Sequence, residues 1–119
     1  MAMDYANDRI LIVDHLYGLI EVSLSAGERQ YFSSSDPSNM NSIELDLANN
    51  RLLVSEGAGY GIYQADLTTR SFSTFSAAVG SGNELIAIND STSELVKTGF
   101  VQRVFDLDTA GYTDVSFTD

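Results

Sequence analysis

Side chains that could bind a cation occur in several of the expected loops of this chain. They are two aspartate or glutamate residues that follow apolar runs, Asp14 and Glu56, and three further residues, Asn41, Asn83 and Glu84. Carboxylate and amide oxygens are the ligands that hard cations such as Ca²⁺ prefer. The same side chains are common in loops because they accept hydrogen bonds from turn backbone. Both interpretations stay open at the level of the sequence.

Other reactive groups point to no particular reaction. His15 is the only histidine and could act as a general base, but no nucleophile accompanies it in a recognisable motif. The segment 80–82 reads Gly-Ser-Gly and lacks the Gly-x-Ser-x-Gly pattern of a nucleophile elbow. Tyr17 and Tyr60 occupy similar loops, where with His15 and Asn41 they could line a ligand face, or merely cap the ends of sheets. The catalytic residues, if any exist, are unknown.

The composition excludes several classes of protein. With 119 residues, 44% of them apolar, the chain can bury the core of one domain. It has no cysteine, which excludes disulfides and thiolate metal sites. A net charge of −11 disfavours nucleic acid as a partner, because phosphate would be repelled. No segment has the length and apolarity of a membrane span, and the N-terminus lacks a signal peptide. A full-length chain of this kind would be expected in the cytoplasm.

An internal repeat organises the sequence. Asp4, Asn7 and Arg9 recur with the same spacing as Asp46, Asn49 and Arg51, each set followed by an apolar run. A weaker third copy aligns Leu107 with Leu67 and Leu95 with Leu53. A period of about 40 residues with only short β-like runs is typical of propeller blades. The repeats predict an all-β, single-domain unit of three four-stranded antiparallel sheets, with blades at about 1–35, 36–78 and 79–119.

The second repeat contains four runs of strand length, 42–47, 51–56, 61–67 and 71–77. Residues 52–54 are apolar on both sides of the pleat, which a strand needs only when both faces of its sheet are covered. The last run is polar, as suits an edge strand.

Turn residues complete the prediction. Asn49-Asn50 favours a turn with positive φ between the first two runs. In the third repeat, the Val- and Phe-rich segment 92–105 is interrupted by Gly99 and predicts two more strands. In a four-stranded meander, the loops after the second and the fourth strand open on the same side. The candidate ligands and the two tyrosines therefore share one face.

The stretches 48–56 and 62–69 resemble the blades of the six-bladed β-propeller superfamily, which includes NHL-repeat, YWTD-repeat, strictosidine-synthase-like and regucalcin-like proteins. The shared features are a hairpin carrying Asn49, Arg51 and Glu56 and a second one carrying Asp66 and Leu67. The resemblance implies a propeller fold. Because members range from lactonases to protein-binding domains, it does not choose an activity. Related enzymes carry calcium or another divalent ion on the loop face, which Asp14, Glu56, Asn83 and Glu84 would hold here.

The number of blades departs from that family. Three blades are too few to close a ring and would leave two apolar faces exposed. Two copies related by a twofold axis would form a six-bladed ring in which blade one of each copy packs on blade three of the other. The alternative is a piece of a longer chain. We therefore expect a homodimeric binding or scaffold module for a protein or small ligand; the alternative is a metal-dependent hydrolase of the lactonase or esterase kind.

Overall fold

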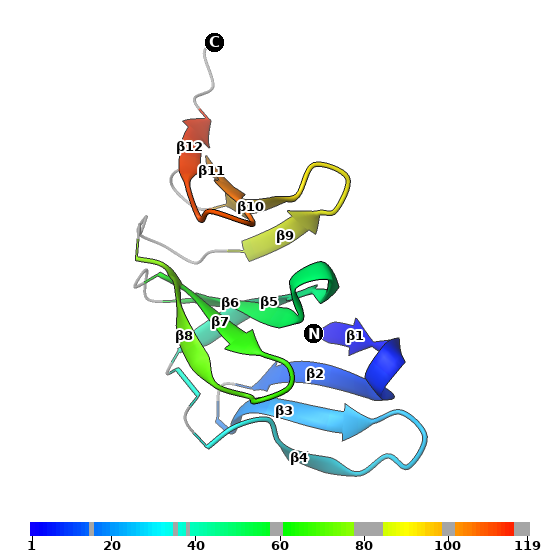
Figure 1. Cartoon of the computed structure of the whole chain (residues 1–119). Helices are drawn as coiled ribbons and strands as arrows, with labels where there is room; N and C mark the ends of the chain where they lie inside the picture. The colour runs from blue at the N-terminus through cyan, green and yellow to red at the C-terminus, as the bar shows by residue number, and fades with distance from the viewer. Residues whose placement is uncertain are drawn as a thin grey trace.

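The computed structural model describes residues 1–14, 16–34, 36–37, 39–57, 61–77, 85–98 and 102–115. The protein is all-β and consists of three four-stranded antiparallel sheets, each built from consecutive strands. The sheets stack face to face along the length of the molecule, with the first at the bottom and the third at the top of Figure 1. Among the described residues, no helix has the length and apolarity to cross a membrane.

Each sheet is a simple meander in which the strand order follows the sequence. Sheet 1 contains β1 (Ala2–Asp4), β2 (Arg9–Asp14), β3 (Gly18–Ser23) and β4 (Arg29–Tyr31). Sheet 2 contains β5 (Met40–Asp46), β6 (Arg51–Glu56), β7 (Ile62–Asp66) and β8 (Phe72–Ser76). Sheet 3 contains β9 (Leu85–Asn89), β10 (Glu94–Thr98), β11 (Gln102–Asp106) and β12 (Tyr112–Val115). The first strands are neighbours across the stack, because β5 contacts both β1 and β9.

The strands of sheet 2 agree with the four runs expected from the sequence. β6 is buried along nearly its whole length, as its apolar character on both sides of the pleat predicts. β8 is an edge strand, as its polar sequence predicts. The segment 92–105 indeed contains two strands, β10 and the start of β11.

The turn between β5 and β6 is longer than the sequence suggested. Leu47–Asn49 forms the 3₁₀ turn η2, and only Asn50 has a left-handed backbone, with φ at 50°. Sheet 1 has the same arrangement, with the 3₁₀ turn η1 (Tyr5–Asn7) followed by Asp8 at φ 53°. Asparagine and aspartate tolerate this conformation better than most residues, which explains their presence at the two positions.

The third repeat is aligned one residue differently from the expectation. Glu94 pairs with Asn89 at the position where Arg51 pairs with Asp46. Leu95, which is fully buried, therefore takes the place of Leu52 and not of Leu53. The sequence alignment was wrong here because the Asp and Arg that mark the hairpin in the first two repeats are Asn89 and Glu94 in the third.

One backbone hydrogen bond recurs in all three sheets. The residue after the third strand donates its N–H to the carbonyl of the left-handed residue before the second strand. The three bonds are Leu24 to Asp8 at 2.9 Å, Leu67 to Asn50 at 3.0 Å and Leu107 to Ser93 at 3.0 Å. Leu67 and Leu107 therefore occupy equivalent positions in their sheets, as expected from the sequence.

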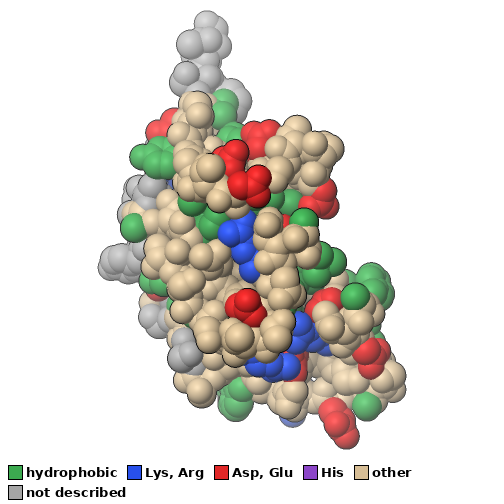
Figure 2. Space-filling view, in the orientation of Figure 1, with side chains coloured by type: hydrophobic (Ala, Val, Ile, Leu, Met, Phe, Trp, Pro, Cys, Tyr) green, Lys and Arg blue, Asp and Glu red, His purple; other side chains and the backbone are tan. Residues whose placement is uncertain are grey.

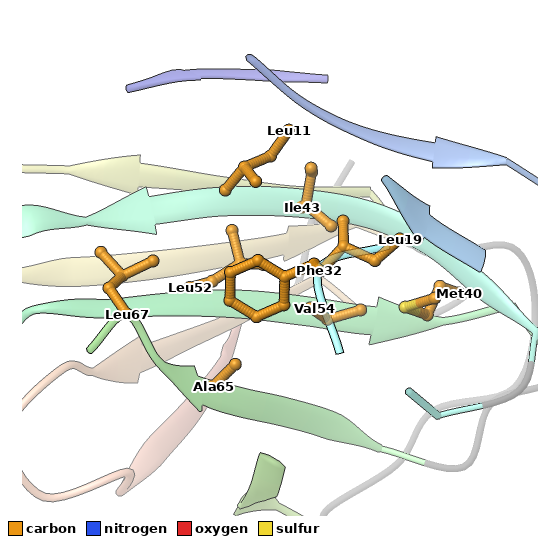
Figure 3. Packing of buried hydrophobic residues seen from close by; sticks show 9 residues of the cluster. All are labelled: Leu11, Leu19, Phe32, Met40, Ile43, Leu52, Val54, Ala65 and Leu67. Atoms are coloured by element: carbon orange, nitrogen blue, oxygen red, sulfur yellow. The ribbon is translucent and has the colours of Figure 1, made fainter. Parts of the chain in front are cut away.

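Two apolar cores lie between the sheets. The first joins sheets 1 and 2 and contains Leu11, Leu19, Phe32, Met40, Ile43, Leu52, Val54, Ala65 and Leu67 (Figure 3). The second joins sheets 2 and 3 through Leu53, Ile62, Phe75, Ile86, Leu95, Phe105 and Leu107. The alternation of side chains along β6 sends Leu52 and Val54 to one core and Leu53 to the other.

Arginine side chains reinforce these junctions. Arg9 donates to Asp4 and Glu21, each at 2.9 Å, and Arg70 of sheet 2 reaches across to the same Glu21 at 2.9 Å. Arg51 of sheet 2 donates to Asp46 at 2.7 Å and also to the backbone carbonyl of Leu107 in sheet 3. Figure 2 shows basic side chains gathered where the sheets meet, with acidic side chains on the surrounding surface.

Candidate functional site

The connections after the second and fourth strands meet at one end of the stack, which we call the loop end. Gly57 donates its N–H to the Asn39 carbonyl at 2.7 Å, which joins the loop after β6 to the segment before β5. In sheet 1, a Cβ on Gly18 would lie 3.1 Å from Asp36 Oδ2. The loop after β2 therefore touches the segment that leads from sheet 1 to sheet 2. These contacts agree with the shared face expected from a meander.

Asp14 organises the turn after β2. Its Oδ1 accepts hydrogen bonds from the backbone N–H groups of Leu16 at 2.7 Å and Tyr17 at 3.0 Å. This is the turn-forming role that short acidic side chains commonly play. These contacts account for Oδ1, and the role of Asp14 as a cation ligand stays a prediction.

Asp36 was not among the candidate residues, yet its carboxyl group contacts Gly18 and Leu19 at the loop end. Its Oδ2 accepts the N–H of Leu19 at 2.9 Å, whereas Oδ1 is buried and has no hydrogen-bond partner in the described structure. Burial raises the pKa of Asp36, and the Leu19 hydrogen bond offsets part of that increase. An acidic residue in the segment between two repeats was the only signal in the sequence.

Glu56, a predicted ligand, ends β6 at the same end of the molecule. It pairs with Met40 across the sheet, and only 5% of its surface is exposed. Its Oε2 is buried and has no hydrogen-bond partner in the described structure. Because burial disfavours the charged form, the pKa of Glu56 is raised. Ligand-binding sites often contain a buried carboxyl group that has few hydrogen bonds to offset the cost of its burial.

We expect Glu56→Gln to stabilise the protein at neutral pH. A carboxyl whose pKa is raised on folding binds its proton more tightly in the folded state, so its contribution to stability falls as the pH rises through the raised pKa. Glutamine has the same size and no charge, so it removes that loss. Urea unfolding followed by circular dichroism should show a higher midpoint for the variant at pH 7 and a smaller difference near pH 4. An equal or lower midpoint at pH 7 would show that Glu56 is compensated in the folded state.

The structure describes only some of the other predicted site residues. Tyr17 lies in the turn after β2 with 58% of its surface exposed. Asn41 is half-buried in β5, and its side chain lies against Gly57. Both therefore belong to the loop end. His15, Tyr60, Asn83 and Glu84 lie outside the described residues.

The predicted metal site is not assembled from described residues alone. Within the part of the chain that the structure describes, no three His, Cys, Asp or Glu side chains lie close enough together to hold a metal ion. Asp14 and Glu56 are two of the four predicted ligands, and the other two, Asn83 and Glu84, are not described. A divalent cation at this end of the molecule thus stays a prediction from the resemblance.

Comparisons with known proteins identify the fold. No protein-family model and no curated protein sequence matches the chain. A chain in a crystal structure of a nidogen/laminin complex superposes with a TM-score of 0.79 at 16% identity, over 95% of this chain and 45% of the other. The N-terminal domain of Nup159 superposes with a TM-score of 0.72 at 11% identity, over 97% of this chain and 32% of the other. The chain thus spans less than half of either structure. Both matched structures are propellers, and the likeness, together with the three meander sheets, shows that this chain has a β-propeller fold.

Proposed function

We propose that this protein is a β-propeller binding or scaffold module that binds a protein or peptide at its loop end. The loop end carries an exposed aromatic side chain, Tyr17, and two carboxyl groups with one buried oxygen each, those of Asp36 and Glu56. Tyrosine supplies a large contact area at a low cost in conformational entropy, which is why binding surfaces are rich in it. Rigid sheets that present loops at one end are a common scaffold for recognition.

The observation that carries this proposal is that the loops of two repeats both contact the segment that links them. The approach of Gly18 to Asp36 and the hydrogen bond from Gly57 to Asn39 bring the loops after β2 and β6 against the segment between β4 and β5. Among the described residues, Asp36 Oδ1 and Glu56 Oε2 have no hydrogen-bond partner, which favours a ligand with donor groups, such as a peptide N–H or a lysine side chain. One matched structure is a nidogen bound to laminin, which supports protein binding as a use of this fold.

A second part of the proposal concerns assembly. The chain spans 45% of the nidogen structure and has three sheets, and propellers with so few blades do not close. We propose that two copies join into a six-bladed ring with twofold symmetry, which brings two loop ends to the same side of the ring. The alternative is that further blades of a longer chain complete the ring.

Selection from a phage-displayed peptide library tests the binding role. We expect the immobilised protein to enrich a family of peptides whose affinity falls about tenfold or more in the variant Tyr17→Ala, as for an aromatic contact residue. Tyr5→Ala is the matched control, because Tyr5 is 75% exposed and lies in η1, away from the loop end. Peptide affinities measured by calorimetry that are equal for both variants, or more reduced by Tyr5→Ala, would place the binding surface elsewhere.

A further inference from the structure

Each sheet in the stack has two faces, one directed toward the next sheet in the chain and one toward the preceding sheet. The forward face of each sheet, which packs on the next sheet, carries Arg9 and Leu11 in sheet 1 and Arg51 and Leu53 in sheet 2. The backward face packs on the preceding sheet and carries Leu52 in sheet 2 and Leu95 in sheet 3. Two faces are left at the ends of the stack, which are the backward face of sheet 1 and the forward face of sheet 3 (Figure 1).

Both end faces are apolar at their centres. On the backward face of sheet 1, four isoleucine and valine side chains are half-buried and Tyr31 is 62% exposed. The four are Ile10, Ile12, Ile20 and Val22. A hollow of about 480 Å³ opens on this face, lined by Ile20, Arg29 and Tyr31 and, where the face meets the loop end, by Tyr17. The forward face of sheet 3 carries Val96 and Val104, half-buried, and Val115, which is 41% exposed. Apolar sheet faces of this kind usually have a partner.

We infer that the forward face of sheet 3 in one copy packs on the backward face of sheet 1 in a second copy, with Glu94 opposite Arg29. This inference rests on the proposed ring of two copies and specifies its junction. Within the chain, a forward face packs on a backward face twice, between sheets 1 and 2 and between sheets 2 and 3. The junction with a second copy would be a third contact of the same type. In a twofold ring, the same junction forms twice.

The charges of the two end faces are complementary. Glu94 stands where the first two sheets have Arg9 and Arg51, because it pairs with Asn89 as they pair with Asp4 and Asp46. At this one position of the forward face, sheet 3 therefore has a negative side chain where sheets 1 and 2 have a positive one.

The backward face of sheet 1 shows the opposite change. Arg29 pairs with Val22 at the position where Phe72 pairs with Ala65, so an arginine replaces an aromatic residue.

The junction between sheets 1 and 2 shows that these two positions are near each other. The Phe72 ring lies 6.1 Å from the Phe32 ring, and the Arg9 guanidinium lies 5.7 Å from that same Phe32 ring. At the junction between copies, the residues in the places of Arg9 and Phe72 are Glu94 and Arg29. Both side chains are long, and complementary charges at an interface fix its register.

Sedimentation equilibrium of charge-exchanged variants tests the junction. At low ionic strength, we expect the unmodified chain to sediment with twice its mass of 12.9 kDa. Glu94→Arg alone and Arg29→Glu alone each place like charges opposite each other and should weaken dimerisation about tenfold or more. Asp108→Arg, at an exposed position in the turn after β11, is the control for net charge and should leave the dimer intact.

Mixing the two single variants gives the decisive result. In a mixed dimer, like charges meet at neither junction: one junction pairs the introduced arginine with the introduced glutamate, and the other keeps the native pair. We expect the mixture to form dimers at a concentration where each variant alone is monomeric. A monomeric unmodified chain would overturn the two-copy ring itself. A stable dimer that neither substitution weakens, or weakened variants that mixing does not restore, would overturn only the junction proposed here.

Discussion

Replacing Asp46 with alanine is expected to lower the free energy of unfolding by about 3 kcal/mol, since removal of one partner leaves a largely buried charge uncompensated. Asp46 is 2% exposed and accepts hydrogen bonds from Arg51 at 2.7 Å and Asn49 at 2.8 Å. The Arg51 side chain is 15% exposed, and its other hydrogen bonds go to two neutral acceptors, Gln64 and the Leu107 carbonyl. Urea unfolding followed by circular dichroism at pH 7 measures the loss.

Two further variants show whether the charge is the cause. Asp108→Ala changes an exposed aspartate and should alter stability by less than about 0.5 kcal/mol. Asp46→Ala combined with Arg51→Met removes both charges, and we expect this double variant to be more stable than Asp46→Ala alone. If the double variant is the less stable of the two, the contacts of Arg51 with sheet 3 matter more than its charge compensation.

The second large effect is expected for Phe32→Ala, at about 3–5 kcal/mol of lost stability, the range for deletion of a buried aromatic ring. Phe32 is 1% exposed and lies between sheets 1 and 2, where its ring contacts Phe72 edge to face. The guanidinium groups of Arg9 and Arg70 lie 5.7 Å and 5.2 Å from the same ring. The deletion therefore removes an apolar core residue and two cation–π contacts together.

The measurement must separate this loss from any effect of dimerisation. All variants should be unfolded in urea at one protein concentration, because association contributes to apparent stability. Tyr5→Ala is the control, since its side chain is 75% exposed, and we expect a change below about 0.5 kcal/mol. A loss below about 1 kcal/mol for Phe32→Ala would mean that the two sheets repack without the ring.

The repeat explains why so much of the fold could be predicted from the sequence. Asp4 and Arg9 recur as Asp46 and Arg51 because both pairs form the same ion pair across the first hairpin of a blade. Residues that must meet over a short distance in the chain leave a local pattern, and a pattern seen twice is hard to attribute to chance. Where Asn89 and Glu94 replace the pair, the pattern is lost and the sequence alignment slipped by one residue.

Contacts between blades left no such pattern. Arg70 and Glu21 belong to different sheets and are distant in the sequence, so neither residue indicates the other. Arg70 also occupies a left-handed position, with φ at 63°, where Gly27 serves in sheet 1. Its role at the junction became visible only in three dimensions. The same holds for the loop end, since the burial of Glu56 depends on how β6 lies within the stack and not on its neighbours in the chain.

The position of β6 has a consequence for how the molecule opens. Leu52, Leu53, Val54 and Ser55 are all fully buried, and this strand pairs on both sides within the middle sheet. Amide hydrogens are replaced by deuterium only when their hydrogen bonds break, and cores surrounded by packing on every side break last. Amides of the edge strands β4 and β12 should therefore exchange with heavy water first, and those of β6 should exchange last.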